Sequence, residues 1–163
     1  VQTCALPISR LLREVVARIK ASLSSRCLLF VRLSATDWVE GGWDLPQSVA
    51  LAQDLRALGV DLLDVSTGGL LPGVRIPVAP GYQTPFAEAI KRDVRIPTAT
   101  VGLVTEASQA DALIAEERAD AVLLARELLR NPYWPLQAAH RLGQTVTWPR
   151  QYLRAMPPPA AKV

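Results

Sequence analysis

Short apolar runs alternate with amphipathic segments along most of the chain. Four runs are of strand length and lack a regular polar alternation: residues 27–33, 61–65, 97–101 and 121–124. Such runs are typical of strands that are buried on both faces of a parallel sheet. Because helix-like segments separate them, the pattern predicts an α/β fold with about four parallel strands and right-handed crossovers.

The segments between the strands carry apolar residues at helical spacing and recognisable helix ends. Ser9 and Asn131 are the expected N-caps of the first and last helices, and Gly59 stands where a C-terminal glycine belongs. The predicted helices cover residues 9–23, 46–58, 84–91, 105–117 and 131–143. Residues 147–163 are rich in proline and are predicted to form a tail without regular structure.

Two architectures fit this order of elements. An open doubly wound sheet normally carries a glycine-rich phosphate loop after its first strand, but here that strand continues into Arg32, Leu33 and Ser34. In a (β/α)8 barrel the chemistry lies on the loops that follow the strands. The sequence therefore favours half of such a barrel, formed by residues 9–146.

Composition excludes several other classes of protein. Net charge is +3 with no run of basic residues, so a nucleic-acid surface is not expected. No apolar stretch approaches the roughly 20 residues that cross a bilayer. Two cysteines and one histidine do not suffice for a zinc cluster. Cys27 is expected to pack as a small hydrophobe, and Cys4 and Cys27 together indicate a reducing, cytoplasmic setting.

Unusual residues stand where the predicted strands end. Arg32 interrupts an apolar run, and a buried arginine needs an anionic or carbonyl partner. A structural ion pair with Asp64 is the alternative interpretation. Gly102 and Arg126 suggest a phosphate site, because glycine allows close backbone approach and arginine offers a planar fork. A plain turn and a surface salt bridge are the alternatives for these two residues.

Six segments resemble successive segments of the old yellow enzyme family, over roughly Arg10 to Met156. They are FVRLSATDW, GVDLLDVSTGG, APGYQTPFAEAIK, ATVGLVTEASQA, RADAVLLARELLRNPYWPLQAA and PRQYLRA. The resemblance is strongest to the short bacterial subclass with NADPH dehydrogenases and xenobiotic reductases. It implies the C-terminal half of an FMN-dependent TIM barrel that uses NAD(P)H as reductant.

The resemblance also implies roles for single residues. Arg32 would contact the flavin ring near N1 and O2, where a positive charge stabilises the anionic reduced flavin. Val101 and Gly102 form the turn whose amide binds the FMN phosphate. Arg126 would bind the same phosphate, and Ala125 replaces the glycine that usually precedes it.

Further residues have less direct roles in the resemblance. Arg154 would reach across a homo-oligomer interface to line the partner's substrate pocket. Ser66 and Gln83 lie in matching segments near the site but are assigned no chemistry, and His140 is expected at the surface of a peripheral helix. Residues 1–8 do not match the family and are expected to be a non-native or misassembled lead-in.

The implied activity is an ene-reductase that reduces the activated C=C bond of small enone-type substrates. The catalytic side chains of the family lie largely in the other half of the barrel, so this chain alone is expected to be inactive. Another FMN barrel, of the dihydrouridine synthase or dihydroorotate dehydrogenase type, remains an alternative. A non-catalytic half barrel that serves binding or assembly is a second alternative.

Overall fold

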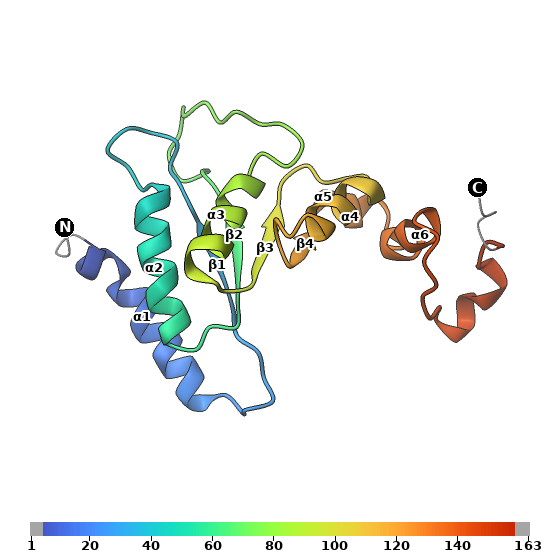
Figure 1. The fold of residues 1–163 in the computed structure, drawn as a ribbon, viewed down its shortest axis with the longest axis horizontal. Coiled ribbons are helices and arrows are strands. Elements are labelled where there is room, and N and C mark those ends of the chain that lie inside the picture. The colour runs from blue at the N-terminus through green and yellow to red at the C-terminus, as the bar shows by residue number, and fades with distance from the viewer. Residues whose placement is uncertain (1–4, 159–163) are drawn as a thin grey trace.

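A computed structural model describes residues 5–158 and shows one parallel sheet with helices. The strands follow the chain order: β1 (Phe30–Ser34), β2 (Leu62–Ser66), β3 (Thr98–Val101) and β4 (Ala121–Leu123). Every neighbouring pair is parallel, as the alternating pattern predicted. The carboxyl ends of all four strands therefore lie at the same edge of the sheet (Figure 1).

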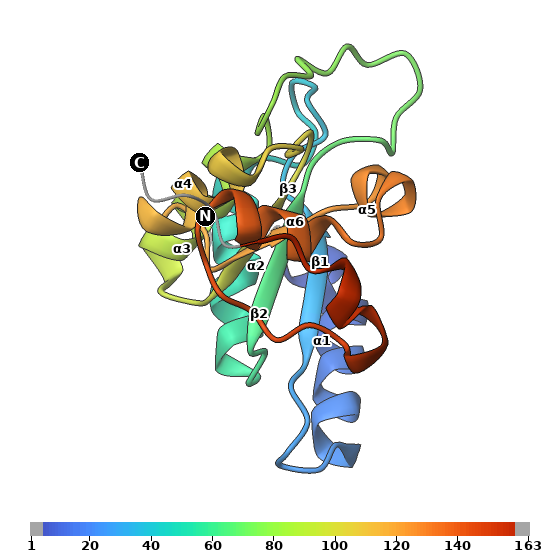
Figure 2. The same cartoon turned by 90° about the vertical axis from the view of Figure 1, so that its right-hand side faces the viewer.

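Helices connect the strands and also flank the sheet. They are α1 (Ala5–Ser22), α2 (Leu45–Ala57), α3 (Thr84–Val94), α4 (Ala107–Ala115), α5 (Arg126–Arg130), α6 (Trp134–Arg141) and the 3-10 helix η1 (Arg150–Ala155). Figures 1 and 2 show α2 and α3 along one face of the sheet. Figure 1 shows α6 and η1 at the end of the molecule far from α1. Within the described residues, no helix is long and apolar enough to cross a membrane.

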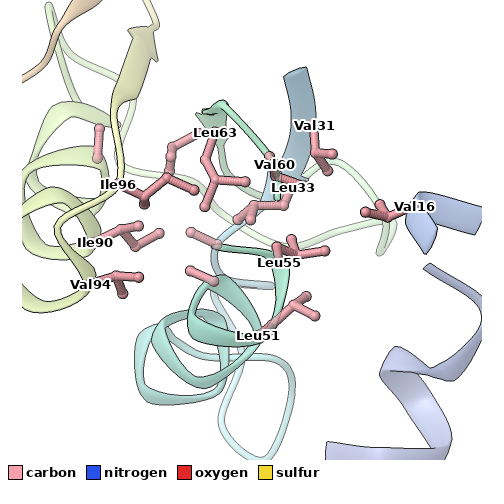
Figure 3. Packing of buried hydrophobic residues seen from close by; sticks show 14 residues of the cluster. Val16, Val31, Leu33, Leu51, Leu55, Val60, Leu63, Ile90, Val94 and Ile96 are labelled. Atoms are coloured by element: carbon pink, nitrogen blue, oxygen red, sulfur yellow. The ribbon is translucent and has the colours of Figure 1, made fainter. Parts of the chain in front are cut away.

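The core lies between the sheet and the helices α1, α2 and α3. Alternate strand residues such as Leu63 and Val65 point toward these helices and are fully buried. Leu55 of α2 and Ile90 of α3 meet them from the opposite layer and are equally inaccessible (Figure 3). This packing positions the strand ends, and with them the loops that carry the candidate site.

The other face of the sheet is open. Phe30 is 56% exposed although it lies in β1, and Arg32 on the same face is also exposed. In a closed barrel this face would be the interior, filled by side chains from all of the strands. The sheet thus has the architecture of half a (β/α)8 barrel, with four of the eight strands.

The first predicted strand begins later than its apolar run suggests. β1 starts at Phe30, and Cys27 lies before it with an exposed thiol. The prediction that Cys27 is buried is therefore wrong. The strand pairing begins only at Phe30 with Leu62, so Cys27 lies in the segment that precedes the sheet.

Helix ends were the least predictable feature. α1 begins at Ala5, so the buried Ser9 lies inside the helix and is not its N-cap. Asn131 follows the unpredicted helix α5 as its C-cap, and α6 begins only at Trp134. The tail contains η1 where no regular structure was expected. Residues 1–4 of the predicted lead-in, including Cys4, and residues 159–163 of the tail lie outside the described part.

Candidate functional site

A cavity of about 240 Å³ opens at the carboxyl ends of β3 and β4. Four of the residues predicted to bind a cofactor line it together: Val101, Gly102, Ala125 and Arg126. Their proximity follows from the strand register, because Val101 pairs with Leu123 and the two chains leave the sheet side by side. The structure therefore brings the two predicted turns into one site.

Gly102 exposes bare backbone to this cavity. Its φ is +125°, a conformation that side chains strongly disfavour. A Cβ atom here would lie 2.9 Å from Nε2 of Gln83 and 2.9 Å from Cε1 of Tyr82. The Gly102 carbonyl accepts a 2.8 Å hydrogen bond from the Gly81 N–H. Only glycine fits between these neighbours, and the turn that it forms lines the cavity with main chain.

Gln83 ties the loops after β2 and β3 together. Its side chain is 4% exposed, and Nε2 donates to the Val101 carbonyl at 2.9 Å. Its Oε1 accepts from the Thr67 hydroxyl at 2.9 Å and also from the Thr67 N–H. The sequence places Gln83 near the site but indicates no role for it, because these hydrogen-bond partners become visible only in the fold.

The charges at the cavity favour an anion. Arg130 and Glu127 pair with each other at 2.8 Å and largely cancel. Arg126 is exposed at the cavity, and no hydrogen bond or ion pair joins it to another side chain in the part of the chain described here. One uncompensated guanidinium beside a bare backbone turn is a suitable arrangement for a phosphate group.

Arg32 lies within β1, in the apolar run that was predicted to form a strand, and not after the end of that strand. Its side chain is 60% exposed. The expectation of a buried arginine is therefore wrong, because the face that would bury it is open. The alternative partner is confirmed: Arg32 Nε donates to Asp64 Oδ2 at 2.5 Å. Arg32 lines a separate 520 Å³ cavity beside β1.

The C-terminal segment does not reach the cavity in a single chain. Arg154 lies exposed on η1. The Tyr152 ring packs edge-on against the Tyr133 ring, with 5.4 Å between the ring centroids. A hydrogen bond between these two tyrosines raises the pKa of Tyr133 above its ordinary value.

His140 is half-buried on α6 and lines a small cavity with the tail. Ser66 donates to the Leu33 carbonyl, within the sheet.

A half barrel with an anion cavity at the ends of its last two strands is typical of barrels that bind a phosphorylated ligand. The chain belongs to the NADH:flavin oxidoreductase / NADH oxidase family, which it matches over residues 9–145. This assignment confirms the resemblance found in the sequence. The cofactors of the family are FMN and NAD(P)H.

The curated relatives are bacterial NADPH dehydrogenases. The protein of that name from Halalkalibacterium halodurans is 48% identical over 146 residues, which are 90% of this chain and 42% of the relative. The NADPH dehydrogenase of Listeria innocua is 49% identical over 127 residues, which are 78% of this chain and 37% of the relative. The chain thus spans about two fifths of the length of these relatives.

Solved structures show the same relation in three dimensions. A 2-naphthoyl-CoA reductase in complex with 2-naphthoyl-CoA superposes with a TM-score of 0.73 at 25% identity, covering 83% of this chain and 21% of that protein. Histamine dehydrogenase from Rhizobium sp. 4-9 superposes with a TM-score of 0.66 at 22% identity, covering 78% and 19%. The chain has the fold of part of these larger oxidoreductases.

Proposed function

We propose that the cavity between β3 and β4 binds the phosphate of FMN, and that the chain is the phosphate-binding half of an NAD(P)H-dependent flavin oxidoreductase. The observation that carries the proposal is the meeting of the bare Gly102 backbone and the exposed Arg126 guanidinium in one cavity. The residues fit the group, since a backbone turn and a guanidinium fork are complementary to a phosphate dianion. Bound FMN would supply the hydride transfer between NAD(P)H and substrate.

Ala125 is the departure from the family pattern in this cavity. It is exposed and immediately precedes Arg126 at the start of α5. Its N–H can donate to an oxygen as that of glycine would, but its methyl group takes up space in the cavity. We therefore expect weaker phosphate binding than a glycine at position 125 would give.

Arg32 is proposed to contact the flavin ring near N1 and O2. Asp64 Oδ2 accepts a hydrogen bond from its Nε, which holds the guanidinium beside β2. Asp64 offsets much of the Arg32 charge, so the expected effect rests on the guanidinium N–H donors, which would stabilise the anionic reduced flavin and thereby raise its reduction potential. We expect Arg32→Ala to lower the potential in a potentiometric titration and to leave phosphate anchoring largely intact.

The first test separates phosphate binding from ring binding. FMN and riboflavin differ only in the phosphate, so flavin fluorescence titrations with each report its contribution. Arg126→Ala should weaken FMN binding roughly 10-fold or more, from a charge-assisted contact worth about 1.5–3 kcal/mol. Riboflavin binding should not change. Arg92→Ala is the matched control, because Arg92 is exposed on α3, pairs with its neighbour Asp93 and does not line the cavity. An FMN preference that survives Arg126→Ala would refute the phosphate role.

The substrate class is proposed from the same family: an activated C=C bond of an enone type, reduced in a homo-oligomer in which Arg154 acts in trans. Arg154 is exposed on the helix η1, which lies beyond α6 (Figure 1), and this exposure supports a role outside its own chain. Arginine suits the task because its fork can bind a carbonyl or stack on a ring. In the full-length enzyme, Arg154→Ala should alter the KM for an enone while FMN content stays constant. If Arg154→Ala and the parent enzyme had identical kinetics while the oligomer stayed intact, the role of Arg154 in trans would be disproved.

A further inference from the structure

The backbone turn at Gly102 is held by a side chain from another loop. Gln83 precedes α3, yet its amide reaches the end of β3 on one side and the loop after β2 on the other. We propose that Gln83, which also lines the cavity, is a positioning residue that sets the Gly102 turn for phosphate through the main chain. This inference rests on the proposed function and adds a residue that acts through the main chain.

Both the Nε2 and the Oε1 atoms of the Gln83 amide form hydrogen bonds. Nε2 donates to the carbonyl of Val101, the residue immediately before Gly102. Oε1 accepts from the Thr67 N–H and from the Thr67 hydroxyl. A primary amide is the neutral group that can donate at one end and accept at the other. A carboxylate would face the Val101 carbonyl with a second acceptor, and an apolar chain would leave three polar groups unpaired.

The glycine and the glutamine fit each other sterically. The missing side chain at position 102 leaves the space that the Gln83 amide occupies, with only 2.9 Å from Nε2 to an ideal Cβ. Two further contacts bind the same segments: the Gly81 N–H to the Gly102 carbonyl at 2.8 Å, and the Thr84 hydroxyl to the Thr100 hydroxyl at 3.0 Å. Those contacts lie on either side of Gln83 and remain when its amide is removed.

Because these contacts are retained, a variant that lacks the Gln83 amide should still fold, and any change in binding then reports on the position of the turn. Thr84, α3 and the core beneath them do not depend on the Gln83 amide. Loss of the amide should therefore release the Val101–Gly102 peptide and lower phosphate affinity. Binding of the flavin ring, which contacts other strands in the proposal, should be unaffected.

The experiment compares three variants of the full chain. Gln83→Met keeps the length of the side chain and removes all of its hydrogen bonds. Thr67→Val removes only the hydroxyl partner of Oε1 and serves as a milder variant should Gln83→Met not fold. Gln47→Met is the control, because Gln47 also donates to a loop carbonyl, that of Gly42, at 3.2 Å but lies at the start of α2.

The primary measurement is the ratio of FMN affinity to riboflavin affinity. We expect this ratio to fall about 10-fold in Gln83→Met and two- to threefold in Thr67→Val, and to stay unchanged in Gln47→Met. The NMR signals of the Thr67 and Gly102 amides should shift in Gln83→Met, while those of α3 should not. A residue that only stabilises the fold would lower both affinities equally or neither.

The outcomes separate the two proposals. If the parent chain shows no preference for FMN over riboflavin, the proposed phosphate site is wrong, and this inference fails with it. If the parent prefers FMN and Gln83→Met retains that preference in a folded protein, only the role of Gln83 is overturned. If Gln83→Met does not fold, an unchanged ratio in Thr67→Val overturns it.

Discussion

Replacing Gly102 by alanine tests the geometry on which the candidate site depends. The φ of +125° is sterically disfavoured for any residue with a side chain, which costs about 1–3 kcal/mol when the fold enforces it. The added methyl would also lie 2.9 Å from both Gln83 Nε2 and Tyr82 Cε1, and overpacking of this kind costs about 1–3 kcal/mol. The two effects together predict a loss of roughly 2–6 kcal/mol in the free energy of unfolding.

Urea denaturation followed by far-UV circular dichroism measures this loss as a lower midpoint at constant slope. Gly73→Ala is the matched control, because Gly73 has a φ of +77° but no atom within 4 Å of an added Cβ. It should lose only about 1–2 kcal/mol, the cost of a left-handed residue. If Gly102→Ala were no less stable than Gly73→Ala, the close packing of Gln83 and Tyr82 around this turn would be wrong.

Three further predictions concern the scaffold. Leu63→Ala removes a fully buried side chain and should destabilise the chain by about 2–5 kcal/mol in the same urea assay. Thr98→Val should change stability by less than about 1 kcal/mol, because the buried Thr98 hydroxyl has no partner among the described residues. The Leu29 N–H, followed by Lys20, holds the pKa of Asp61 below its usual range. The stability that Asp61 adds is therefore complete above about pH 4 and declines as pH falls through the lowered pKa. The stability difference between the parent and Asp61→Ala should shrink over the same acidic range, and a difference that grew on acidification would contradict this.

The strand order could be predicted because each apolar run is short and separated from the next by a helical pattern. Pairing in chain order then follows from the parallel crossovers. The exact ends of the strands and helices could not be predicted, because they depend on which residues the neighbouring elements pair with. Cys27 belongs to an apolar run but has no strand beside it. The five residues of α5 are too few for a helical period to be recognised.

Some residues of the cavity could likewise be predicted from the sequence, and others could not. Gly102 and Arg126 could be predicted because each follows a recognisable strand, and parallel strands end at one edge. Gln83 could not, since its partners Val101 and Thr67 are 18 and 16 residues away and no local pattern links them. Sequence patterns indicate which groups reach the edge of a sheet. Tertiary contacts decide which side chain holds them in place.

The separation of the two arginines bears on the identity of the ligand. Neighbouring strands lie about 4.8 Å apart, so β1 and the end of β4 are separated by roughly 14 Å across the sheet. A free phosphate ion at Arg126 could not also contact Arg32, and the two residues line different cavities. A ligand with a phosphate at one end and an electron-accepting ring at the other could engage both. The arrangement therefore favours FMN over a small anion, and it explains why Arg126→Ala should act on phosphate affinity while Arg32→Ala acts on the flavin potential.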